Sequence, residues 1–146
     1  MAGDLERALL QLERLGAAIE STLGDEVAQE ARECIRQAAQ GIVYDAYTPI
    51  FLSRRGSSGG LMDERNMTSD VAGDTLTVRN ETGLQNLYGG DDNSSLADIV
   101  EEGNAAYYMA RPGPRPFMHE ADEMLSAGRA ENALRAGLRR QGVEVD

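Results

Sequence analysis

The sequence predicts an α+β fold with two N-terminal helices, a small antiparallel β-sheet containing a hairpin, and a C-terminal helix packed against it. Apolar residues recur at steps of three or four over residues 4–47 and again after residue 116, which is typical of helices. Residues 67–80 instead alternate between apolar and polar side chains, as half-buried strands do. The length of 146 residues, with 41% hydrophobic residues, fits a single domain over residues 1–146.

The first helix is expected over residues 4–23. Asp4 is a suitable N-cap, and Gly24 is a suitable stop after the last apolar residue. One apolar row runs along this helix and consists of Leu5, Leu9, Leu12, Leu15, Ile19 and Leu23.

A second helix is expected from Asp25 to about Tyr47, where Pro49 marks its end. Its inward face consists of Val27, Ala31, Cys34, Ile35, Ala38 and Ile42. Because Cys34 lies on this apolar face, we interpret it as a small buried residue rather than a nucleophile.

Residues 48–66, with the sequence TPIFLSRRGSSGGLMDERN, have no usable periodicity and are expected to form a long loop. Loops of this length are usually functional or disordered. Glycine and serine keep the entropy of the free segment high, and arginine grips carboxylates in pairs, so we expect residues 53–62 to be mobile until they order on a partner. The candidate contact residues are Arg54, Arg55, Gly56, Gly59 and Gly60.

The alternating residues 67–80 predict a β-hairpin that turns at Ala72-Gly73-Asp74. Residues 81–95 are polar and rich in glycine, and are expected to form a loop or an irregular strand. Ser95 and Asp98 resemble a capping box that opens a short helix ending near Glu102.

The stretch YYMARPGPRPFM, residues 107–118, predicts a stiff extended crossing, because each proline fixes its own backbone and restricts the residue before it. Pro116 suits the first turn of a closing helix, which should run through Gly128. In this helix Phe117 should be buried beside the apolar rows of the first two helices, and Glu120, Asp122 and Glu123 should complement the positive end. We expect residues 129–146 to continue this helix or to form a frayed or extended tail. The crossing should present a surface to a neighbouring subunit through Arg111, Pro112, Pro114, Arg115 and Pro116.

Charge and residue content exclude several kinds of chemistry. The formal charge is −11 and the sequence contains no lysine, which argues against a typical nucleic-acid binder and excludes a Walker A loop. His119 is the single histidine and Cys34 the single cysteine, so neither a common zinc site nor a nucleophilic pair is expected. Asp91 to Glu102 has part of the EF-hand spacing, but Leu96 occupies the position that requires glycine. We therefore predict no catalytic residue, no metal ligand and no cofactor.

Three blocks of sequence carry a resemblance to a known family. They are VYDAYTPIFLSRRGSSGGLMDERNM, the hairpin DTLTVRNET, and IVEEGNAAYYMARPGPRPFMHEA, which together cover residues from about 43 to 125. In order and spacing they resemble the small head–tail joining, or tail-completion, proteins of long-tailed bacteriophages and prophages. In that family a short Val-Glu-x-Gly segment likewise precedes a Pro-Arg-Pro-Phe turn into the closing helix.

The resemblance implies a structural protein of the virion without catalysis. It implies a homo-oligomeric ring, with sixfold symmetry as the expected arrangement, at the neck or the top of the tail. Neighbouring neck and tail proteins would be its partners, DNA would pass as cargo, and no membrane would be involved. The protein would reside in the virion, and in the host cytoplasm during assembly. The alternative is a small acidic adaptor that binds a host or phage protein, and an enzyme is the third reading.

Overall fold

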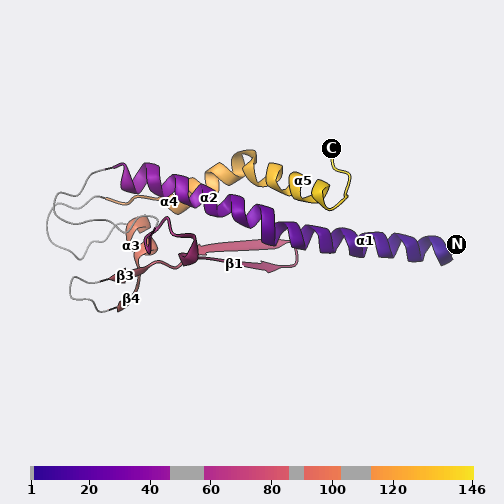
Figure 1. Cartoon of the computed structure of the whole chain (residues 1–146), viewed down its shortest axis with the longest axis horizontal. Helices are drawn as coiled ribbons and strands as arrows, with labels where there is room; N and C mark the ends of the chain where they lie inside the picture. The colour runs from indigo at the N-terminus through magenta and orange to yellow at the C-terminus, as the bar shows by residue number, and fades with distance from the viewer. Residues whose placement is uncertain (1, 47–57, 86–90, 103–112) are drawn as a thin grey trace.

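The computed structural model describes residues 2–46, 58–85, 91–102 and 113–146 (Figure 1). It confirms the α+β class. One long helical rod, an antiparallel β-hairpin and a second two-stranded ladder are followed by helices that return along the rod.

The rod is helical without a break. It runs through α1 (Ala2–Thr22), a π-type turn η1 (Leu23–Val27), α2 (Ala28–Ala38) and a second π-type turn η2 (Ala39–Tyr44). The prediction that Gly24 stops one helix and Asp25 opens another is therefore wrong. A glycine stop requires the left-handed conformation, which Gly24 does not adopt. The hairpin and α5 both contact the rod at η1, which contains Gly24. These tertiary contacts lie where the helix continues through the glycine.

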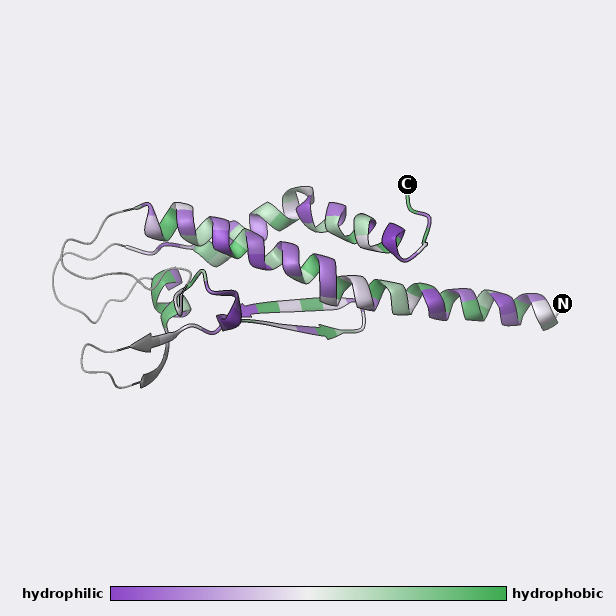
Figure 2. Cartoon of the chain, in the orientation of Figure 1, coloured by the Kyte–Doolittle hydropathy of each residue, from purple (hydrophilic) through white to green (hydrophobic). Residues whose placement is uncertain are grey.

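Burial along the rod is uneven. The inner face of α2 is buried, whereas α1 buries only Ala18 and Thr22. Leu5, Leu9, Leu12 and Leu15 of the first apolar row are exposed, because α1 extends beyond the hairpin and the closing helices, whereas Ile19 and Leu23 are half-buried (Figure 1). Figure 2 shows hydrophobic and hydrophilic residues interleaved along this projecting part. No helix among the described residues is long and apolar enough to cross a membrane.

The predicted hairpin is confirmed. Strand β1 (Met67–Ala72) pairs antiparallel with β2 (Thr75–Asn80), and the two-residue turn between them has Gly73 at a φ of 64°. Where a loop or irregular strand was expected, β3 (Gly83–Gln85) pairs with β4 (Asp91–Ser95). Helix α3 (Leu96–Glu102) then starts as predicted, with the Asp98 N–H donating to Ser95 Oγ at 3.2 Å.

The closing helix is interrupted. Helix α4 (Phe117–Met124) leads through η4 (Leu125–Arg129) into α5 (Ala130–Arg140), and Gly128 kinks the chain with a φ of 115°. Helix α4 packs mainly on α2, and α5 packs on η1 and the base of α1. Residues 130–140 are therefore a packed helix rather than a frayed tail, with Leu138 buried.

The main core lies where α2, α4 and α3 meet the segment before the hairpin. Phe117 is fully buried there, as predicted, together with Leu61, Cys34, Ile35, Val100 and Ala121. We expected Phe117 to lie beside the apolar rows of both N-terminal helices. It lies beside that of α2 alone, since the α1 row points into solvent.

Candidate functional site

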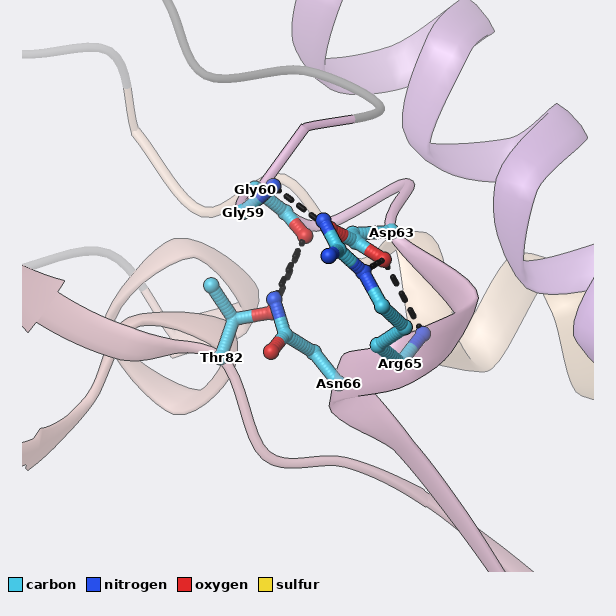
Figure 3. A network of polar contacts seen from close by, with 6 residues as sticks. All are labelled: Gly59, Gly60, Asp63, Arg65, Asn66 and Thr82. Atoms are coloured by element: carbon cyan, nitrogen blue, oxygen red, sulfur yellow. Dashed lines mark hydrogen bonds and ion pairs between the residues drawn. The ribbon is translucent and has the colours of Figure 1, made fainter.

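The segment Gly59–Asn66 folds around the carboxylate of Asp63. Its Oδ2 accepts from the Gly59 N–H at 2.6 Å and its Oδ1 from the Arg65 N–H at 3.0 Å. The Arg65 side chain adds a forked pair, from Nε to Oδ1 at 3.0 Å and from Nη2 to Oδ2 at 2.7 Å (Figure 3). The Arg65 side-chain hydrogen bonds, followed by the two backbone N–H groups, hold the pKa of Asp63 well below its ordinary value.

The neighbouring Gly60 and Leu61 connect this turn to the rest of the fold. The Gly60 carbonyl accepts from Asn66 Nδ2 at 3.1 Å, and Thr82 Oγ1 lies 3.3 Å from the same oxygen (Figure 3). The Leu61 N–H donates to the Tyr44 hydroxyl at 3.2 Å, and its carbonyl accepts from Asn80 Nδ2 at 2.8 Å. The end of the rod and the end of the hairpin are therefore both hydrogen-bonded to one residue, whose side chain is buried in the core.

These contacts correct the expectation of a loose loop. Gly60 and Leu61 are buried and hydrogen-bonded, so the mobile segment predicted over residues 53–62 does not extend through this part. Gly59 and Gly60, which were proposed as contact residues, make hydrogen bonds within the chain, and their contact with a partner stays a prediction. Residues 53–57, including Arg54, Arg55 and Gly56, lie outside the described residues.

Two buried polar side chains support the network from the hairpin. Asn80 is the last residue of β2 and Thr82 lies two residues beyond it, and both the N–H and the Oγ1 of Thr82 donate to Asn80 Oδ1. The Thr82 carbonyl accepts from the Leu96 N–H at 2.8 Å, which fixes the start of α3. Buried polar groups are stable only when they are paired in this way, so the set is expected to specify one arrangement of the chain.

A second set of contacts joins α3 to the start of α4. The Val100 carbonyl accepts from the Arg115 N–H at 2.9 Å, and the Glu101 carboxylate accepts from the N–H groups of Met118 at 2.8 Å and His119 at 3.1 Å. A carboxylate at this position satisfies N–H groups that a helix start leaves unpaired and complements its positive end. The Val-Glu-x-Gly and Pro-Arg-Pro-Phe motifs therefore meet in space.

The described part of the proline crossing leads directly into α4. Pro114 and Pro116 are exposed and Arg115 is half-buried, whereas Arg111 and Pro112 lie outside the described residues. Leu61 and Phe117, the apolar residues of the two motif regions, share one core. The structure thus places the described candidates, Gly59, Gly60 and residues 114–116, around that core.

The described residues hold no group of three His, Cys, Asp or Glu side chains that could bind a metal ion. Cys34 is fully buried, and this burial raises the pKa of its thiol, which disfavours the reactive thiolate. His119 is exposed on α4, with Nε2 3.5 Å from Glu123 Oε1. The hydrogen-bonded segments described above therefore form a structural junction rather than a reactive site. We call it the motif junction, and it consists of Gly59–Asn66, Asn80–Thr82, Val100–Glu101 and Arg115–His119.

Sequence reasoning missed several residues of the motif junction. The acids of α4 itself were expected to complement its start, but the carboxylate comes from Glu101 on another helix. Asp63, Asn80 and Thr82 were given no role. The available signal was an Asp two residues before an Arg, and a polar Asn-Glu-Thr at the end of a strand, both of which are common in ordinary turns.

Comparison with known proteins supplies a family. The YomN family model matches residues 3–140. The SPbeta prophage-derived uncharacterized protein YomN of Bacillus subtilis (strain 168) is 28% identical over 109 residues, which cover 71% of this chain and 70% of that protein. No solved structure matches the chain.

Proposed function

The chain belongs to the YomN family, and from this premise we propose that it is a prophage-encoded structural protein of a phage particle, without enzymatic activity. The support for a phage origin is the similarity to a protein described as derived from the SPbeta prophage.

The finer proposal is a place in the head–tail connection, as one subunit of a neck or tail-completion ring through which DNA passes. The motif junction is the observation that carries it. Among the described motif residues, Leu61, Val100 and Phe117 fill the core, and Asp63 and Glu101 fix the backbone. Motifs that build a scaffold rather than a reactive cleft suit a protein that acts by assembling.

The electrostatics are compatible with this proposal. A net charge of −11 disfavours tight binding of a phosphate backbone, so DNA could move past such subunits without being held. In this proposal the partners are further copies of the chain and neighbouring neck and tail proteins. The location is the virion, reached from the host cytoplasm.

Deleting the gene from the phage that carries it tests the proposal. We expect heads and tails that fail to join, restored by the wild-type gene, and we expect the protein in purified particles by mass spectrometry and immunogold labelling. Normal tailed particles that lack the protein would contradict the proposal. Together with a monomeric or dimeric native mass, they would favour the adaptor alternative.

Point variants separate assembly from folding. Arg54→Ala with Arg55→Ala should leave the thermal unfolding of the isolated protein unchanged and reduce the yield of tailed particles, because the pair is proposed to bind a neighbour. Arg135→Ala with Arg139→Ala, which makes the same charge change on the exposed face of α5, is the matched control and should assemble normally. Unfolding of the isolated protein by the first pair would show that those arginines act within the fold.

A further inference from the structure

Helix α1 carries an apolar row that no described part of the chain covers. Leu5 is 65% exposed, Leu9 52% and Leu12 64%, and at 100° per residue the three lie on one side of the helix. Most helices in proteins are stabilised by packing an apolar face against another element. The row therefore requires a partner surface.

The same chain carries an apolar groove that is also open. Strand β2 forms one wall, α4 and η4 form the other, and the rod forms the floor. Its volume is about 460 Å³. The side chains that make it apolar include Ala31, Ile35, Leu76, Val78, Ala121 and Leu125.

A molecule cannot place its own α1 in its own groove. The helix runs on without interruption into η1 and α2, whose Val27, Ala31 and Ile35 form the groove floor. Folding α1 back onto that floor would require breaking the rod. The convex row and the concave groove can therefore meet only between two copies.

Charge disfavours the antiparallel pairing of α1 with itself. Glu6, Glu13 and Glu20 follow one edge of the apolar row at seven-residue spacing. Asp122 is the charged side chain that lines the groove, and Arg79, the exposed residue after Val78 on β2, lies outside the groove lining and has no ion-pair partner among the described residues. Two α1 helices packed antiparallel through their leucines would instead bring the glutamate row against its own copy, which is unfavourable.

We propose that α1 of one copy docks its leucine row into the groove between β2 and α4 of a second copy. The two surfaces differ, so the contact is heterologous and repeats from copy to copy, closing into a ring or extending as a filament. The expectation of a closed ring, and only that, rests on the proposed function. The family match begins at residue 3, so the projecting helix belongs to the shared family unit and is not an appendage to it.

Cysteine cross-linking of the purified full chain tests the contact. One preparation carries Leu12→Cys on the row, and a second carries Thr77→Cys, an exposed residue on the groove wall. Native Cys34 is fully buried and should not react. Under mild oxidation we expect a disulfide-linked heterodimer in the mixture and little product from either preparation alone. Ala17→Cys, on another side of α1, replaces Leu12→Cys in the control and should give only background.

A matched pair of neighbours supplies the second test. Leu9 and Leu10 are 52% and 53% exposed, but only Leu9 lies in the row. Leu9→Gln added to the cross-linking pair should abolish most of the product, whereas Leu10→Gln should leave it unchanged, and neither should lower the melting temperature. Cross-linking of Leu12→Cys to itself, the absence of any product, or equal effects of the two glutamines would each overturn the proposal. None of these outcomes depends on where the protein lies in a particle.

Discussion

Asp63 shows how one side chain organises a segment that has no regular secondary structure. Its two oxygens accept hydrogen bonds from two backbone N–H groups and from the Arg65 guanidinium, and its side chain is 6% exposed. A charged carboxylate with this many donors is stabilised in its ionised form, which is what the lowered pKa expresses. The turn that places Leu61 in the core therefore depends on that charge.

This dependence predicts an acid-sensitive step. Because the pKa of Asp63 is lower in the folded chain than in the unfolded chain, its contribution is fully present above the unfolded value of about 4 and is lost as the pH falls below it. Asp63→Asn should lower the free energy of unfolding at pH 7 and flatten its decline below pH 4, measured by urea denaturation across pH. Asp70→Asn, on exposed β1, is the control. An equally steep acid decline in Asp63→Asn would contradict this account.

Phe117 is the residue on which the closing helix depends. It is fully buried at the first position of α4, directly after the proline crossing. Phe117→Ala should lower the free energy of unfolding by about 3–5 kcal/mol, because it removes buried apolar contacts and leaves a cavity. Met118→Ala, at a half-buried neighbour, should cost clearly less. Chemical denaturation of the two variants makes the comparison, and a harmless Phe117→Ala would remove Phe117 from the core.

At the scale of elements, the crossing of α5 over the rod depends on a missing side chain. A Cβ on Gly137 would lie 2.2 Å from Thr22 Cγ2 and 2.7 Å from Glu26 Oε2, closer than such contacts allow. Gly137→Ala should therefore force the helices apart and destabilise the protein by about 1–3 kcal/mol, measured by thermal or urea unfolding. A Cβ on Gly16 would have no heavy atom within 4 Å, so Gly16→Ala should not destabilise the protein. If both substitutions behave alike, the close approach is not what the glycine provides.

Two glycines show how far the sequence alone could predict the elements. Gly24 was expected to end a helix and Gly128 to continue one, and the structure has the reverse. Glycine permits both conformations at similar cost, so tertiary contacts decide, and the hairpin and α5 contact the rod at η1. The β1–β2 hairpin and the start of α3 were predicted correctly because their signals, a two-residue turn and a capping serine, are complete within a few residues.

At the scale of the whole molecule, the fold class could be predicted but the distribution of the core could not. Periodicity identified the apolar row of α1 and that of α2 equally well, yet only the second is buried in the free chain. The spacing of apolar residues shows which face of a helix is apolar, but it does not show which surface packs against that face. The motif junction was missed for a related reason. Its hydrogen bonds join residues as distant as Leu61 and Asn80, or Glu101 and Met118, and no local pattern encodes such pairs.

The last helix closes on the base of the first. Arg140 pairs with Glu26, and the Gln141 side chain donates to the Ala18 carbonyl and to Thr22 Oγ1, contacts that join residues 114 to 123 positions apart. A ribosome adding about 5–20 residues per second needs on the order of ten seconds to make the intervening chain. For most of that interval Phe117 and the rest of α4 have not yet been made, so they do not cover the inner face of α2 in the nascent rod. The time at which a new chain is most prone to associate with other chains therefore falls before its own synthesis is finished.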